Sequence, residues 1–247
     1  MGLTTGALLV TVLCAPAAWL AAAVWASSES RVSLAEPRGS IWNGSAQLVL
    51  RGGTGSQDAM ALPGRIRWEI RPQGLGLDLK LNADCCTPQA LLVTVKLDGI
   101  HQAAVMLKDG QSRWPASVLS GLGTPWNTVR PQGDLFVQSR GLAGSWASGR
   151  VQMEGQLQID AREVSSRLST LQPVGSFSLA LTGGKAPTLD VSTLEGSLQL
   201  SGHGEWTGGR LRFLGEASAS PERQDALANL LNILGRRDGA RSIIKLG

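Results

Sequence analysis

The sequence has no tyrosine and only two histidines, and charged residues make up just 17% of its 247 residues. The three cysteines are too few for a disulfide framework. No charged residue occurs before Glu29. The net charge of +4 is scattered along the chain and forms no basic stripe, so we expect no nucleic-acid partner.

Motifs that carry catalysis or bind metals are also lacking. His101 and His203 have no second histidine or cysteine at the spacing of a metal site. No serine lies in a nucleophile elbow, and no glycine-rich loop follows a strand and opens a helix. The acidic residues stand apart in sequence and give no sign of paired carboxylates. We therefore predict no catalytic residues, no metal and no cofactor, and we do not expect an enzyme.

The N-terminus is strongly apolar. Residues 6–26 carry no charge, and at about 1.5 Å per residue they are long enough to cross a bilayer core of about 30 Å. They predict a transmembrane anchor after a short tail at 1–5. A cleaved signal peptide is the alternative, but its usual basic start is missing and the apolar stretch is longer than usual. Residues 27–38 are interpreted as a polar spacer.

Glycine and alternating apolar residues are abundant after the spacer. The chain has 31 glycines, which argue against a helical protein because each glycine inside a helix costs about 1 kcal/mol. Strict alternation over 65–70 and 75–81 predicts strands with one face packed and the other exposed to water. Further strands are expected at 46–50, 91–97, 103–107, 135–137, 151–159, 177–181, 194–200 and 211–214. A hairpin turn at Asp98-Gly99 and a short helix over 115–122 are also expected.

The C-terminal region predicts a helix followed by a strand. Residues 220–222 are a typical helix start, and Gly235 marks its end. A single apolar stripe is formed by Leu227, Leu230, Leu231 and Leu234. This helix should cover one face or end of the sheet, and residues 242–246 should form a last strand.

Three tryptophans each precede a glycine and then a strand. They are Trp42 before Gly44, Trp146 before Gly149, and Trp206 before Gly208. The repetition predicts a reused structural corner, and two similar halves, 39–125 and 126–247, are one interpretation of it. For Trp42, Trp68, Trp146 and Trp206, packing in a core is favoured over anchoring of a partner.

Cys85 and Cys86 are adjacent in the sequence. Two interpretations stay open: half-buried thiols near a turn, or a disulfide between neighbours. In an oxidising compartment, exposed thiols could also link two chains.

Four segments in this order resemble the type II secretion system protein N family of Gram-negative bacteria. They are GSIWNGSA at 39–46, PGRIRW at 63–68, GSLQLSGHGEW at 196–206 and LLNILGRR at 230–237. The resemblance implies an accessory inner-membrane component with its body in the periplasm. It also implies other secretion subunits as partners and offers no catalytic residues.

These observations predict a mainly β protein: an antiparallel, curved or partly open meander sheet with an N-terminal transmembrane helix and a C-terminal helix. The β-rich domain would span 39–247 in the periplasm, tethered by a single pass through the inner membrane. Candidate structural or interaction residues are Trp42, Gly44, Trp68, Trp146, Trp206, Leu227, Leu230, Leu231 and Leu234, with Cys85 and Cys86 as a candidate disulfide.

The expected function is a structural or assembly role in type II secretion. One alternative is a membrane-tethered lipid-binding or lipid-transfer module, because the leucine-lined face of an open sheet could shield acyl chains. A hydrolase is a further alternative, which a pocket of converging acids or a serine–histidine pair would support.

Overall fold

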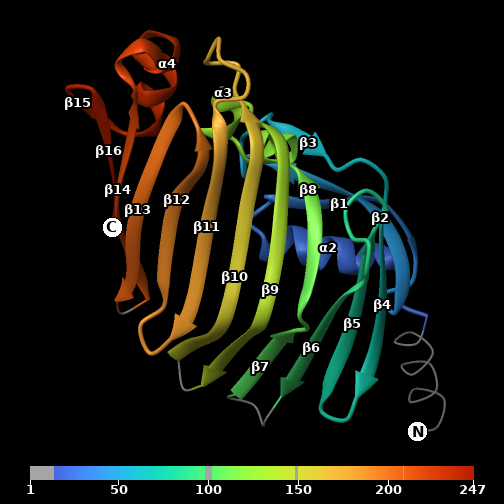
Figure 1. The fold of residues 1–247 in the computed structure, drawn as a ribbon. Coiled ribbons are helices and arrows are strands. Elements are labelled where there is room, and N and C mark those ends of the chain that lie inside the picture. Colours follow the sequence, from blue (N-terminus) through green and yellow to red (C-terminus); the bar gives the residue numbers. More distant parts are fainter. Residues whose placement is uncertain (1–13, 98–101, 148–149, 208) are drawn as a thin grey trace, which may run out of the picture.

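The structure is a computed structural model that describes residues 14–97, 102–147, 150–207 and 209–247. These residues form one antiparallel sheet of sixteen strands, which is strongly curved (Figure 1). The strand order is β1-β2-β4-β5-β6-β7-β9-β10-β11-β12-β13-β14-β16-β15, with β3 beside β2 and β8 beside β9. Most neighbours in the sheet are neighbours in the chain, as expected when short turns join alternating segments. The predicted antiparallel meander is thus confirmed.

The elements have the following bounds. The strands of the first part are β1 (Val32–Gly39), β2 (Asn43–Arg51), β3 (Ala59–Ala61), β4 (Ile66–Gln73), β5 (Gly76–Ala83), β6 (Leu91–Leu97), β7 (Gln102–Leu107) and β8 (Gly110–Pro115). The later strands are β9 (Gln132–Ala147), β10 (Arg150–Ser165), β11 (Gly175–Gly184), β12 (Thr188–Gly196), β13 (Leu198–Thr207), β14 (Arg210–Ala219), β15 (Arg236–Asp238) and β16 (Arg241–Leu246). The helices are α2 (Ala17–Ser27), α3 (Trp126–Val129) and α4 (Gln224–Leu234), with 3₁₀ turns η1 (Ala116–Leu122) and η2 (Pro221–Arg223).

The strand ends form two edges of the sheet, and these edges differ in the connections that they carry. Short connections between β4 and β5, between β11 and β12, and between β13 and β14 lie along one edge, which we name the turn edge. The opposite edge carries η1, α3 and α4, and we name it the loop edge (Figure 1).

The two faces of the sheet also differ, because side chains alternate along each strand. In the pairing of β4 with β5, Trp68 lies opposite Leu81, whereas Glu69 lies opposite Lys80. The face that carries Trp68 is covered in part by α2, and we name it the inner face. Figure 1 shows α2 in the hollow of the curved sheet. The outer face carries most of the charged side chains.

Strand β9 joins the strands that precede it in the chain to the strands that follow it. It pairs with β7 through residues 143–147 and with β8 through residues 134–139. A bulge lets β9 and β10 stay paired along their length; at its centre Gly155 has a φ of +80° and lies against Gly141. The sheet is therefore continuous across residue 125, and the interpretation as two similar halves stays a prediction.

Several boundaries differ from the sequence-based predictions. Residues 32–38, predicted as part of a spacer, lie in β1. The alternation of apolar and polar residues is weak in β1, because an edge strand tolerates polar residues and Pro37. The predicted strand 194–200 is wrong, because the chain turns at Gly196, whose φ is +121°. The predicted helix at 115–122 is the 3₁₀ turn η1. The C-terminal helix and final strand are confirmed as α4 and β16.

The predicted anchor at 6–26 lies partly outside the described residues. Its later part forms α2, which follows Pro16 and packs on the inner face. Within the described part of the chain, no helix is long and apolar enough to cross a bilayer. The turn predicted at Asp98-Gly99 also falls outside that part.

Candidate functional site: the inner face of the sheet

Helix α2 covers one end of the inner face. Ala17, Leu20, Ala21 and Val24 face the sheet at the spacing of one helical stripe. They pack against a buried cluster of Leu34, Ala46, Leu62, Ile66, Trp68, Ala83, Cys86 and Val118. The other side of α2 is exposed and apolar, with Trp19 56% and Trp25 39% exposed. The helix is therefore buried on one side only.

Trp68 is the largest side chain of this first cluster. It is 3% exposed, and its Nε1 donates a hydrogen bond to the carbonyl oxygen of Ile41 at 3.1 Å. Gly44 lies directly against it, because a Cβ at Gly44 would sit 2.5 Å from Cζ2 of Trp68. Glycine at 44 thus makes room for the indole.

Helix α4 covers the other end of the inner face. Leu227, Leu230 and Leu231 are buried against a second cluster that includes Val174, Phe177, Leu198 and Ala217. The hydroxyl of Ser242 on β16 is fully buried and donates to the carbonyl oxygen of Leu231 at 2.7 Å. This bond satisfies a carbonyl near the C-terminal end of the helix and fixes α4 to the last strand.

Between the two covered ends, the inner face is open. Among the apolar side chains on it that belong to neither cluster are Leu97, Val105, Trp146, Met153, Leu181 and Leu189. We name this set the apolar trough. Leu97 is 52% exposed, and Val105 and Trp146 are each 44% exposed. The trough runs from β6 to β12 in the half of the sheet nearer the turn edge.

The outer face is polar and is organised by pairs across strands. The guanidinium groups of Arg113 and Arg162 lie 5.3 Å and 4.9 Å from the ring centroid of Phe136. Arg113 also donates to Asp134, and this bond holds the pKa of the Asp134 carboxyl below its ordinary value. These groups lie on neighbouring strands and give the outer face its charged character.

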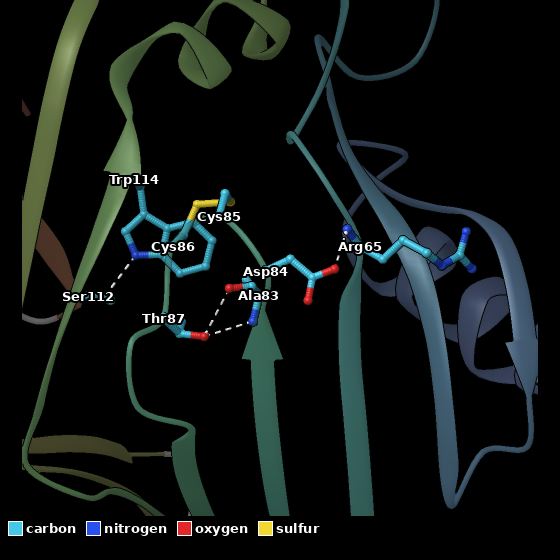
Figure 2. Close-up of a disulfide and its surroundings, with 8 residues drawn as sticks. All are labelled: Arg65, Ala83, Asp84, Cys85, Cys86, Thr87, Ser112 and Trp114. Carbon is cyan, nitrogen blue, oxygen red and sulfur yellow. Dashed lines mark hydrogen bonds between the residues drawn. A yellow bond between two sulfur atoms is a disulfide. The ribbon is translucent and has the colours of Figure 1, made fainter.

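The adjacent cysteines lie in the connection from β5 to β6, at the loop edge (Figure 2). Their sulfurs are bonded to each other in the structure. Cys86 is 2% exposed and lies beside Trp114, whereas Cys85 is exposed. The backbone N–H of Arg113 donates to the carbonyl oxygen of Cys86 at 2.8 Å. The loop thereby links the end of β5 to β8; the redox state of the pair in the cell stays a prediction.

The one described histidine lies among acids on the outer face. Nδ1 of His203 is 2.6 Å from Oδ1 of Asp190, and Nε2 is 3.4 Å from Oε1 of Glu205. The bonds to Asp190 and then to Glu205 raise the pKa of His203 above its ordinary value. All three side chains are exposed. In the part of the chain that the structure describes, no group of three or more histidine, cysteine, aspartate or glutamate side chains is arranged to hold a metal ion.

Replacing Asp190 by asparagine is expected to lower the pKa of His203 toward 6.5, and E205Q should lower it less. Because the folded-state pKa is raised, the stabilisation from this cluster is complete below the unfolded-state pKa. It disappears as the pH rises through the folded-state pKa. An NMR titration of the imidazole, with the H203Q variant for assignment, measures the shift. An unchanged pKa in D190N would show that the contact does not persist in solution.

A comparison with protein families gives one match over most of the chain. The model of the family described as type II secretion system protein N matches residues 30–244. The chain belongs to this family. No curated protein and no solved structure matches it significantly. The resemblance drawn from the sequence motifs is thus confirmed, and the protein is a type II secretion system component.

Two of the four motifs that indicated the protein N family lie at corners of the fold. Residues 39–46 form the turn from β1 into β2, where the carbonyl oxygen of Trp42 accepts from the N–H of Ile70 at 2.7 Å. Residues 230–237 run from α4 into β15. Both segments fall within the matched residues.

The predicted candidate residues lie in three different environments. Trp68 and Cys86 belong to the first cluster, and Gly44 lies against Trp68. Leu227, Leu230 and Leu231 are buried in the second cluster, against which Leu234 packs. Trp42 and Trp206 are half-buried, and Trp146 is 44% exposed, so core packing does not hold for Trp146. His101 lies outside the described residues.

Sequence reasoning suggested that a leucine-lined face of the sheet could shield acyl chains, but it did not identify the residues of the apolar trough. Leu97 and Val105 were predicted only as members of alternating segments, and Leu189 was not singled out. Alternation shows that they share a face with buried residues, but it carries no sign of what covers that face. The available signal was that only two short helices are predicted after the N-terminal segment, one over 115–122 and one near the C-terminus. Two such helices are too few to cover so wide a sheet.

Proposed function

We propose that the protein is an accessory component of the type II secretion system, tethered to the inner membrane by one N-terminal segment with its β-rich body in the periplasm. Its role is structural, in assembling or stabilising the machine through contacts with other secretion subunits, and it is not catalytic. The match to the protein N family over residues 30–244 carries this proposal. The absence of charge before Glu29 supports the tether.

The lateral ends of the sheet are poorly suited to adding a partner strand. In β1, Pro37 lacks an N–H and Glu36 has a φ of +47°. At the other end, β15 has only three residues, all exposed, and two of them are arginines. Short strands, proline and charge are the features that prevent edge-to-edge pairing. Subunit contacts are therefore expected on the faces and loops.

The outer face offers a specific surface for such a contact. A shallow depression of about 470 Å³ lies across β4 to β7. Leu92 and Met106, each 37% exposed, lie within it, and charged side chains including Arg71, Asp78 and Lys80 surround them. An apolar centre with a charged rim is typical of non-obligate protein interfaces.

Deletion of the gene is expected to reduce secretion of folded periplasmic substrates of this system, and the tagged full chain should co-purify with other secretion subunits from cross-linked membranes. A variant with Leu92→Glu and Met106→Glu should recover fewer subunits, because two charges would enter the centre of the contact. The matched control is Leu214→Glu, a 59% exposed leucine on β14, away from the depression.

Two outcomes distinguish the proposed secretion role from the proposed contact at the outer depression. If secretion is unchanged after deletion and no subunit co-purifies, the proposed function is wrong. If the deletion phenotype is present but the double variant behaves like Leu214→Glu, the function stands and the contact lies elsewhere. The lipid-binding alternative is compatible with this role, because the inner face and the outer depression are different surfaces.

A further inference from the structure

We propose that the apolar trough binds an acyl chain of an anionic phospholipid, with the headgroup at the turn edge. The inference goes beyond the secretion role and does not depend on it. It rests on the open part of the inner face, the exposed side of α2 and the charges at the turn edge.

The composition of the trough favours hydrocarbon over a peptide strand. Its six side chains, Leu97, Val105, Trp146, Met153, Leu181 and Leu189, offer no acceptor, and the Trp146 indole N–H is their one polar group. A peptide strand laid on this face would lose water from its backbone groups without gaining hydrogen bonds. An acyl chain has no polar groups to satisfy, and each buried CH₂ contributes about 0.8 kcal/mol.

The dimensions fit one chain. The trough crosses β6, β7, β9, β10, β11 and β12, which is five strand spacings of about 4.8 Å, or about 24 Å. One acyl chain spans half of a bilayer core of about 30 Å, or roughly 15 Å. A single chain can therefore lie along the trough.

The exposed side of α2 adds a second apolar surface on the same inner face. Trp19 and Trp25 lie outside the first cluster among exposed alanines of the helix, and the Arg51 guanidinium of β2 lies 5.8 Å from the ring centroid of Trp25. A helix without charge on its exposed side is unusual in water but is expected where hydrocarbon is close. It also continues directly from the apolar N-terminal sequence, which would bring the trough near a membrane.

Basic side chains at the turn edge favour an anionic lipid headgroup. Three exposed basic residues lie at the turn edge: Lys185 in the turn after β11, and Lys96 and Arg210 on the outer side of β6 and β14, each next to an inner-face leucine in the chain. Basic groups near an apolar surface attract anionic lipid headgroups. The arrangement therefore fits a phosphatidylglycerol-type lipid better than a zwitterionic one.

The test uses the full chain reconstituted in vesicles of phosphatidylethanolamine and phosphatidylglycerol. A phosphatidylglycerol probe with a photoreactive group in its acyl chain is cross-linked, and the labelled peptides are mapped by mass spectrometry. We expect labels on inner-face residues of β6 to β12, in addition to any near the N-terminus. Val105→Asp with Leu181→Asp should reduce trough labelling about tenfold, equivalent to about 1.4 kcal/mol.

The control Leu214→Asp, on the outer face, should leave trough labelling unchanged. Lys96→Glu with Lys185→Glu changes only exposed side chains and should remove the preference for the phosphatidylglycerol probe over a phosphatidylethanolamine probe. Circular dichroism confirms that each variant is folded. Labelling confined to residues 1–27, or equal trough labelling in wild type and both double variants, would overturn the proposal. Protection of the trough by a co-purifying protein in place of lipid would also overturn it.

Discussion

Replacing Trp68 by alanine is expected to lower the free energy of unfolding by about 3–5 kcal/mol, the range for removal of a large aromatic side chain from a core. Trp68 is 3% exposed and packs in the cluster that holds α2 against the sheet. The substitution leaves a cavity above Gly44 and removes the donor to the carbonyl oxygen of Ile41. Urea unfolding followed by circular dichroism measures the loss.

Two further variants show whether burial causes this effect. Trp68→Phe retains most of the ring and should cost less, largely the loss of one hydrogen bond at about 1 kcal/mol plus some packing. Trp146→Ala removes the same side chain from a site that is 44% exposed and should cost under about 1 kcal/mol. Equal losses at positions 68 and 146 would contradict the assignment of one tryptophan to a core and the other to an open face.

Replacing Leu231 by alanine is expected to cost about 2–5 kcal/mol, as for other fully buried leucines. Leu231 is 0% exposed and lies at the centre of the cluster between α4 and the sheet. Its carbonyl oxygen also accepts the hydrogen bond from the buried hydroxyl of Ser242. Loss of the side chain should therefore loosen both α4 and β16. Thermal and urea unfolding, with hydrogen exchange of residues 224–246, report this effect.

The matched control lies two residues along the same helix. Ile233 is 41% exposed, and alanine has the higher helix propensity, so Ile233→Ala should change stability by less than about 1 kcal/mol. If Leu231→Ala and Ile233→Ala had the same effect, α4 would not pack as the structure shows. A large loss of stability with unchanged exchange in β16 would contradict the link through Ser242.

The secondary structure was predictable where alternation or a helical stripe was long and unbroken. The strand predicted at 91–97 matches β6 residue for residue, and the leucine stripe at 227–234 lies in α4. Prediction failed where local sequence is ambiguous. Residues 194–200 look like one apolar segment but contain a hairpin turn, since only the neighbouring strands determine where the chain reverses. The polar, proline-containing β1 was missed for a different reason: as an edge strand it tolerates polar residues and Pro37, which hide the alternation.

The candidate site was less predictable than the fold. Both Trp68 and Trp146 lie on the inner face, yet Trp68 is buried in the first cluster and Trp146 is open. Alternation assigns a side chain to a face of a sheet, while burial depends on what covers that face. Likewise, adjacency alone left the state of Cys85 and Cys86 open, whereas the position of Cys86 beside Trp114 depends on how β8 lies against the preceding loop.

By itself, the sequence determined the strand periodicity, the C-terminal helix, the apolar N-terminal region and the family, because these follow from local residue order. Only the tertiary structure decided the curvature of the sheet, the continuity through β9, and which part of the inner face is left uncovered. Those properties arise from pairing between distant strands and from the reach of two short helices. They are therefore set by contacts between segments that are far apart in the chain.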